Sequence, residues 1–130
     1  MALERDTVQR WLDAYVQAWL SYEPDAIGAL FSDDATYAFH PWDKNGAVAH
    51  GRAAIVKAWS EPKDPPGTYQ AQYEPIAIDG DVAVATGRSS YFTKSGVLKR
   101  EYYNCFVMQF DSDGRCTQFT EWFMKVPKST

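Results

Sequence analysis

Apolar side chains recur every three or four positions in the first part of the chain. On residues 4–20, and just beyond them, this face consists of Val8, Trp11, Tyr15, Ala18 and Tyr22. The spacing predicts an amphipathic helix with one broad buried face. Trp19 widens the apolar stripe.

The next segment changes character several times within a short length. Pro24 suits the first position of a short second helix, which would bury Ile27, Leu30 and Phe31. The Asp33-Asp34 pair predicts a polar turn, and residues 36–40 predict a short strand. A third helix is expected after Gly51, with Ile55, Ala58 and Trp59 facing inward.

From residue 68 onward the apolar positions alternate instead. Four strands are predicted, over residues 68–78, 82–92, 98–110 and 115–126. Helices followed by an antiparallel meander predict an α+β fold in which the helices cover one face of a bent sheet. We expect residues 1–130 to form one domain with a single core.

The turn between the last two strands predicts which side chains share a face. If residues 111–114 form a four-residue loop, Phe106 lies opposite Phe119 and Asn104 lies opposite Glu121. Tyr102 and Phe123 continue the same face. The face is largely apolar, so we expect it to meet the first helix.

The preceding turn adds a third strand to this prediction. If residues 94–96 form a three-residue loop with Gly96 in the left-handed conformation, Arg88 lies opposite Tyr102 and Thr86 lies opposite Asn104. A polar row then crosses three strands. A two-residue loop would instead turn Arg88 to the other face.

Glu121 would be a carboxylate in a largely apolar chamber. Desolvation raises a carboxyl pKa toward neutrality and suits general acid or base chemistry, whereas a neighbouring Arg88 would hold the group ionised. A structural ion pair between Arg88 and Glu121, completed by Asn104, explains the same residues. Both interpretations are open at this point.

Charge and composition exclude several classes of partner. The net charge is −4, and the Lys and Arg residues are scattered, so we expect no nucleic-acid partner. No apolar run is long enough for a membrane helix, and the charged first residues do not resemble a signal peptide. We expect a cytoplasmic protein in which Cys105 and Cys116 are free thiols.

The histidines do not predict a metal centre. Neither His40 nor His50 has a Cys or carboxylate four residues further on, so we expect no metal, and no phosphate loop or dinucleotide fingerprint predicts a cofactor. Strand alternation would turn His40 away from Tyr37 and Phe39.

The order of these segments resembles a known superfamily. An aromatic helix, the run from Asp25 to Tyr37, and then His50-Gly51-Arg52-Ala53-Ala54-Ile55 resemble the SnoaL-like, or nuclear-transport-factor-2-like, superfamily. The resemblance implies a cone in which a curved sheet and helices enclose a small-molecule pocket. It also implies a homodimer through the outer sheet face, where Tyr103, Val107, Trp122 and Met124 are expected.

Two enzyme branches can be compared residue by residue. In the resemblance to ketosteroid isomerases, Tyr15 takes the place of the tyrosine in the oxyanion hole. The general-base aspartate falls on Phe39 and the protonated aspartic acid falls on Phe106. Two of the three catalytic positions are therefore lost, and steroid isomerisation by that mechanism is not expected.

Limonene epoxide hydrolases offer the second comparison. Their motifs resemble Tyr37-Ala38-Phe39, Arg88-Ser89-Ser90 and Glu121-Trp122-Phe123. Tyr37, Arg88 and Glu121 keep the chemistry, whereas Phe39 and Ser90 replace polar groups that position the water.

The sequence thus leads to one enzyme hypothesis and one alternative. In the first, Glu121 shuttles a proton, Arg88 and Asn104 tune it, and Tyr15 or Tyr37 binds an oxyanion in an isomerase, dehydratase, cyclase or hydrolase. The ligand would be a small apolar, oxygenated or aromatic molecule. Its pocket would be lined by Trp11, Trp19, Phe39, Thr86, Tyr102, Asn104, Phe106, Phe119 and Phe123. The alternative is a non-catalytic binding or dimerisation module.

Overall fold

The computed structural model describes residues 3–127 and has the expected α+β architecture. Its helices are α1 (Arg5–Ser21), α2 (Pro24–Gly28) and α3 (Arg52–Ser60), with a 3-10 turn, η1 (Asn45–Ala47). Its strands are β1 (Phe31–Ala38), β2 (Ala49–His50), β3 (Tyr69–Asp79), β4 (Val82–Phe92), β5 (Leu98–Phe110) and β6 (Cys116–Lys125). The bounds predicted for β4 and β5 are confirmed.

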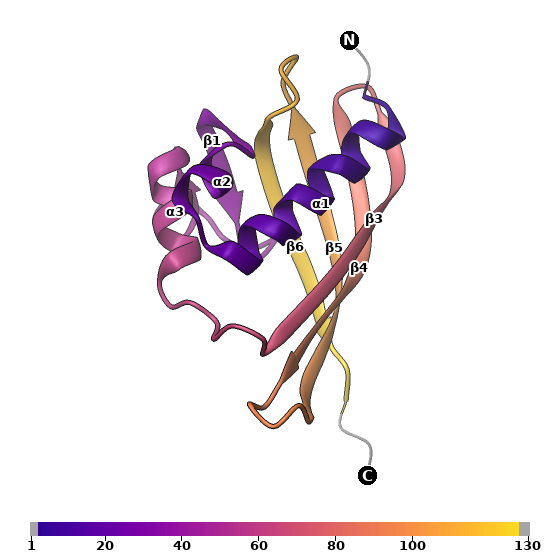
Figure 1. Ribbon diagram of the computed structural model, residues 1–130. Coiled ribbons are helices and arrows are strands. Elements are labelled where there is room, and N and C mark those ends of the chain that lie inside the picture. The colour runs from indigo at the N-terminus through magenta and orange to yellow at the C-terminus, as the bar shows by residue number, and fades with distance from the viewer. Residues whose placement is uncertain (1–2, 128–130) are drawn as a thin grey trace.

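All six strands form one curved sheet in the order β2-β1-β6-β5-β4-β3. The pairing is antiparallel except between β1 and β6, which run parallel. Figure 1 shows α1 crossing in front of the long strands, with α2, α3 and β1 gathered at one side. The helices therefore cover one face of the sheet, and no helix among residues 3–127 covers the other.

Helix α1 buries the face that the sequence predicts. Its buried positions are Val8, Trp11, Leu12, Tyr15 and Ala18. The helix ends at Tyr22, whose φ of 53° is left-handed and whose backbone N–H donates to Ala18 O over 2.8 Å. This conformation suits glycine best, but here it carries a phenol back toward the helix.

Strand β1 begins earlier than predicted. Phe31 belongs to β1 rather than to the second helix, and Asp33 and Asp34 lie within the strand as exposed residues instead of forming a turn. The pairing of β1 is irregular between Phe31 and Thr36. Arg52 donates to Phe31 O and pairs with Asp33 Oδ1 at 2.8 Å. Pairing with β6 has overridden the local preference for a turn.

The register between β4 and β5 corrects the prediction for Arg88. The three-residue loop is present, since Thr93 N donates to Val97 O and Gly96 has a φ of 90°. A bulge then follows, because Phe92 pairs with Leu98 but Tyr91 pairs with Arg100. This extra residue in β5 reverses the alternation of β4 from Tyr91 back to Val82. Each of these side chains therefore lies on the face opposite to the predicted one.

The register between β5 and β6 shifts by two residues and preserves the face. Phe110 pairs with Cys116 and Gln109 with Gln118, so Thr117 is a bulged residue. Phe106 therefore lies opposite Glu121, rather than opposite Phe119 as predicted. Because side chains alternate with a period of two, Glu121 still points to the same side as Asn104.

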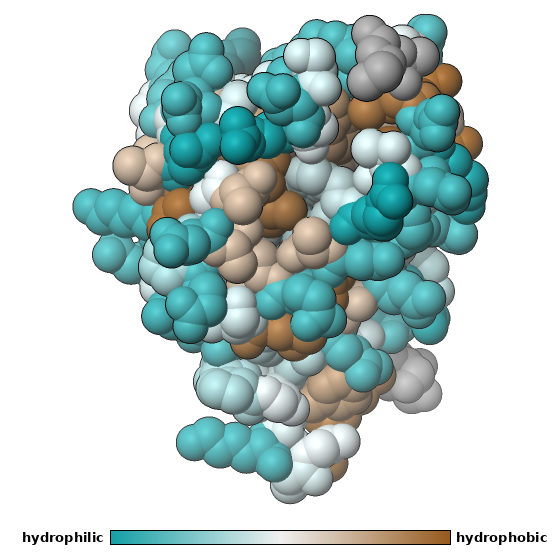
Figure 2. Space-filling model, turned by 45° about the horizontal axis from the view of Figure 1, so that its top comes forward, coloured by the Kyte–Doolittle hydropathy of each residue, from teal (hydrophilic) through white to brown (hydrophobic). Residues whose placement is uncertain are grey.

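The surface and the thiols complete the description. On the face drawn in Figure 2, hydrophilic residues cover most of the outline and apolar residues gather toward the centre. Cys105 and Cys116 are free thiols, as predicted, and burial raises the pKa of Cys116 to about 12. Within residues 3–127, no helix is long and apolar enough to cross a membrane.

Candidate functional site

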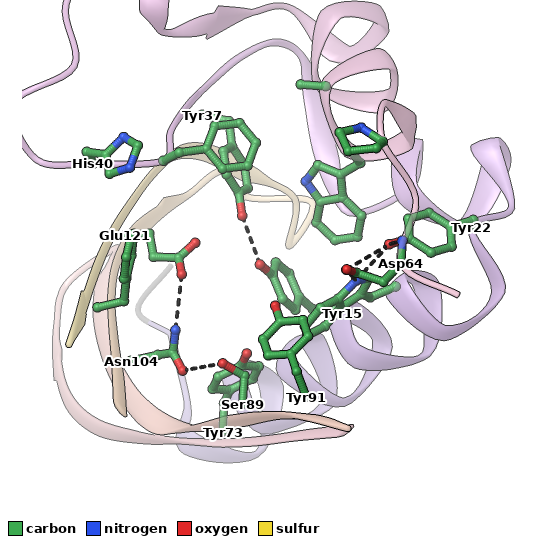
Figure 3. Close-up of a pocket in the computed structure, with 16 residues that line it drawn as sticks. Tyr15, Tyr22, Tyr37, His40, Asp64, Tyr73, Ser89, Tyr91, Asn104 and Glu121 are labelled. Carbon is green, nitrogen blue, oxygen red and sulfur yellow. Dashed lines mark hydrogen bonds between the residues drawn. The ribbon is translucent and has the colours of Figure 1, made fainter. Parts of the chain in front are cut away.

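An open cavity of about 420 Å³ lies between the helices and the inner face of the sheet, and sixteen residues line it (Figure 3). They come from α1, α3, the segments that follow α1, β1 and α3, and five strands of the sheet. The volume is in the range of small-molecule sites. Its polar groups form three clusters.

The first cluster surrounds Glu121 on β6. Asn104 Nδ2 donates to Glu121 Oε2 over 3.1 Å, and Ser89 Oγ donates to Asn104 Oδ1 over 2.9 Å. Ser89 and Asn104 are buried. Desolvation raises the pKa of Glu121 from its usual 4.5 to about 7, although the Asn104 amide partly opposes this by favouring the charged form. Glu121 can therefore take up or release a proton near neutral pH.

The second cluster is a pair of buried phenols. The hydroxyls of Tyr15 and Tyr37 are 2.8 Å apart, and both side chains are almost fully buried. Burial, as the largest cause, raises the pKa of each phenol well above its usual value, so both are neutral. One hydroxyl donates to the other, which leaves the second hydrogen free for a ligand.

Packing holds these phenols in place. The rings of Tyr15 and Tyr37 stack on Phe119, with centroids 5.6 Å and 4.4 Å away. Tyr15 also packs edge-on against Trp59 at 4.9 Å. Trp59 Nε1 is the buried side-chain polar atom without a hydrogen-bond partner among the described residues.

Tyr73 on β3 lines the cavity beside the phenols of Tyr15 and Tyr37. Its ring lies against Gly87 of β4, where an added Cβ would come within 2.4 Å of Tyr73 Cδ1 and 2.0 Å of Gln72 O. Glycine is therefore required at this position by close approach. Because Gly87 has no side chain, the Tyr73 ring can lie against it and reach the cavity.

The third cluster lies across the cavity from Glu121 (Figure 3). Tyr22 Oη accepts a hydrogen bond from Asp64 N over 2.9 Å and from Trp19 Nε1 over 3.0 Å. The same hydroxyl donates to Asp64 Oδ2 over 3.3 Å. The left-handed end of α1 thus fixes the segment that follows α3.

His40 lines the cavity, whereas strand alternation predicted that it would point away. Strand β1 ends at Ala38, so alternation no longer applies two residues later. His40 Nδ1 lies 3.2 Å from Asp43 Oδ2, and the backbone N–H of His40 donates to the same carboxylate oxygen over 3.1 Å. The imidazole stacks on Trp42 at 4.8 Å.

Several sequence-predicted site residues meet in this cavity. They are Glu121, Tyr15, Tyr37, Asn104, Trp19, Phe39 and Phe123. Tyr102 instead lines an adjoining hollow of about 200 Å³, which shares Glu121 and Asn104. The polar row therefore exists, but it runs through Ser89 rather than Thr86.

Other predicted site residues lie elsewhere. Arg88 is exposed on the outer face, where its guanidinium donates to Tyr103 Oη over 3.4 Å, and Thr86 lies beside it. The bulge in β5 is the cause, and it removes the predicted ion pair with Glu121. Three more residues belong to the core rather than to the cavity wall: Trp11, Phe106 and Phe119.

Sequence reasoning missed several lining residues. Ser89 and Tyr91 lie on the face opposite to Arg88, so the register of a two-residue loop, which turns Arg88 outward, would have turned them inward. Asp64 lies in an irregular segment with no periodic signal. The helical spacing places Tyr22 on the apolar helix face and gives no sign of its hydrogen bonds to the segment after α3. Within residues 3–127, no group of three or more His, Cys, Asp or Glu side chains could hold a metal ion.

Most of the amino-acid sequence matches a known protein family. The model of the SnoaL-like domain matches residues 12–119, which is most of the chain. The chain belongs to the SnoaL-like family. No curated protein sequence matches this SnoaL-like chain.

Solved structures share the SnoaL-like fold at low sequence identity. An NTF-2 like protein of unknown function from Burkholderia xenovorans superposes with a TM-score of 0.69 at 18% identity, over 96% of this chain and 88% of that chain. A Kribbella flavida protein, proposed to be a ketosteroid isomerase, gives 0.68 at 15%, over 97% and 84%. An LEH-like epoxide hydrolase of M. tuberculosis gives 0.66 at 18%, over 94% and 86%. At these identities the likeness shows the fold alone.

Proposed function

We propose that this SnoaL-like protein binds a small, mostly apolar molecule that carries an oxygen or an aromatic ring, and that Glu121 moves a proton on it. The observation that carries the proposal is the Glu121 carboxyl group inside the cavity, hydrogen-bonded by Asn104. Desolvation there raises its pKa to about 7. A general acid or base works best when its pKa lies near the working pH.

The site contains the groups that a proton transfer next to a carbonyl needs. The Glu121 carboxylate would take a proton from a carbon beside a carbonyl, and the electron pair of that bond would move onto the carbonyl oxygen. The free hydrogen of the Tyr15 and Tyr37 pair would donate to the oxygen as it gains charge. Glu121 would then return the proton at the same or another carbon.

This chemistry favours an isomerase, a dehydratase or a cyclase over a hydrolase. Proteins of the same fold have been described as a proposed ketosteroid isomerase and as an LEH-like epoxide hydrolase. Epoxide hydrolysis in the resemblance needs Arg88 inside the cavity, but its guanidinium lies on the outer face. In the resemblance to ketosteroid isomerases, Phe39 takes the place of the general base, and Phe39 lines the cavity here, so Glu121 would have to serve instead.

Deuterium exchange tests the proposal without knowledge of the natural substrate. The probe is 2-tetralone, an uncharged aromatic ketone whose protons beside the carbonyl are weakly acidic. The protein should accelerate their exchange with D2O in proportion to its concentration, as measured by proton NMR. Glu121→Gln should abolish the acceleration because an amide cannot accept the proton.

The matched control is Glu74→Gln. Glu74 is an exposed glutamate whose ion pair with Arg5 is 3.6 Å long and solvent-exposed, so its loss should leave both fold and exchange unchanged. Exchange that persists in Glu121→Gln, or that is absent from the folded wild-type protein, would overturn the proposal.

A second candidate function is assembly through the outer sheet face. Large apolar side chains are exposed there: Tyr103, Trp122 and Met124. Such a patch is typical of an interface, so we propose a homodimer, in a cytoplasm that keeps the two thiols reduced. Met124→Lys should yield monomers in sedimentation equilibrium, whereas Leu20→Lys on α1 should not. A monomeric wild-type protein would contradict this.

A further inference from the structure

The charge of the cavity is one-sided. Asp64 and Glu121 line it from opposite sides (Figure 3), and no lysine or arginine is among the sixteen lining residues. His40 is the remaining basic group, and its imidazole is already paired with Asp43. A ligand in this cavity therefore faces carboxyl groups without a compensating fixed cation.

The walls near Asp64 are aromatic. Trp19, Tyr22 and Tyr91 line this end, and the centroids of Trp19 and Tyr91 are 6.0 Å apart at an angle of 60°. The faces of such rings carry partial negative charge and attract cations. Carboxylate and ring faces therefore favour the same sign of ligand charge.

Two of these rings already attract cations from outside the cavity. Lys63 Nζ lies 5.6 Å from the centroid of Tyr22, and Arg100 Cζ lies 4.4 Å from the centroid of Tyr91. Neither Lys63 nor Arg100 lines this cavity, although Arg100 lines the adjoining hollow that shares Tyr91 and Glu121 with it. Both rings attract cations in this structure, and none of the sixteen residues that line the cavity itself is a lysine or an arginine.

Hydrogen bonds hold Asp64 in place through one of its two carboxylate oxygens. Its Oδ2 accepts from Tyr22 Oη and from Trp19 Nε1, each over 3.3 Å, and its N–H donates to Tyr22 Oη. No hydrogen bond to Oδ1 is formed by the side chains or backbone of residues 3–127. One carboxylate oxygen therefore stays available in a fixed position.

We propose that the cavity selects a ligand with a positively charged nitrogen on an apolar body, bound with the charge between Asp64 and the rings of Trp19, Tyr22 and Tyr91. This inference rests on the proposed function only in that the cavity takes a small molecule. It narrows the ligand class to amines and quaternary ammonium compounds. Proton transfer by Glu121 is not required for it.

A pair of probes of equal shape tests the charge directly. Phenyltrimethylammonium carries a permanent positive charge, and tert-butylbenzene has the same shape without it. Isothermal titration calorimetry at about pH 8, where most of Glu121 is ionised, should show the cation binding about tenfold more tightly or better.

Two variants locate the effect. Asp64→Asn keeps the size of the side chain and should weaken the cation by about fivefold to tenfold while leaving tert-butylbenzene unchanged. Asp34→Asn removes an exposed carboxylate that lies outside the cavity, so it should change neither affinity.

Any of the following results would overturn the inference. Equal affinity of the two probes would mean that the cavity takes small molecules without regard to charge, and the proposed function would stand. Failure of the cation to bind, or cation binding that Asp64→Asn leaves unchanged, would also overturn it. Deuterium exchange of the uncharged 2-tetralone tests the proposed proton transfer separately. A failure of the cation preference can therefore be distinguished from a failure of the proposed function.

Discussion

Asn104 and Glu121 are joined by a hydrogen bond of 3.1 Å from the amide Nδ2 to the carboxyl Oε2, within the cavity. The hydroxyl of Ser89 donates to the other end of the amide and fixes its orientation. The amide favours the ionised carboxylate, while desolvation favours the neutral acid and is the larger effect. The balance between these two influences makes Glu121 a group that exchanges protons near neutrality.

Replacing Asn104 should shift this balance. Asn104→Leu keeps the size of the side chain but removes the donor, so the pKa of Glu121 should rise above about 7, by about one unit. Carbon-detected NMR of the glutamate carboxyl measures it. Arg88→Ala is the control and should leave the pKa unchanged, because Arg88 lies on the outer face. A large shift in Arg88→Ala would contradict the register described for β4.

Glu121 should also make the stability of the protein depend on pH. Its pKa is raised in the folded state, so between about 4.5 and about 7 the folded protein binds more protons than the unfolded chain. The free energy of unfolding should therefore fall as pH rises through this window, by on the order of 2–3 kcal/mol from this group. Glu121→Gln should lose this component.

Urea unfolding at about pH 5 and about pH 8 checks it. The free energy of unfolding of Glu121→Gln minus that of the wild type should be larger at about pH 8 than at about pH 5, because only the wild type loses stability over this range. A difference between the two proteins that is the same at both values would contradict the raised pKa.

Gly87 is expected to be intolerant of any side chain. Gly87→Ala places a Cβ against the backbone of Gln72 and the ring of Tyr73, so the free energy of unfolding should fall by about 1–3 kcal/mol. Gly46→Ala is the matched control, since its Cβ meets nothing within 4 Å. Chemical denaturation of both variants measures the effect, and equal stabilities would refute the close packing.

The hydroxyl of Tyr22 should stabilise the segment after α3. Tyr22→Phe keeps the ring but leaves Asp64 N–H and Trp19 Nε1 without this acceptor, so we expect a loss of about 1 kcal/mol. Tyr103→Phe removes an exposed hydroxyl and should cost less than about 0.5 kcal/mol. Amide hydrogen exchange should increase around Asp64 in Tyr22→Phe alone; unchanged protection there would argue against this role.

The sequence predicted the strands and their turns better than the faces of the strands. The loop before β5 has the predicted length, and Gly96 has the predicted positive φ. Arg88 nevertheless lies outside, because the bulge beyond the loop inserts one residue and reverses the alternation. Nothing in the apolar pattern of residues 98–100 marks such an insertion.

The prediction for Glu121 survived a larger error in register. The shift between β5 and β6 amounts to two residues, and an even shift leaves each side chain on its face. Asp64 and His40 lie in irregular segments, where no period connects sequence to direction. The place of Asp64 follows from its tertiary contact with Tyr22, and that of His40 from its local contact with Asp43, three residues further on.

The most direct test of this account is the pKa of Glu121 in the wild-type protein, measured by carbon-detected NMR titration of its side-chain carboxyl. We expect a midpoint near 7, because the carboxyl is desolvated in the cavity and has no cationic partner among the described residues. A midpoint near the usual 4.5 would contradict it, since the carboxyl would then be solvated or paired, and proton transfer by Glu121 would lose its basis.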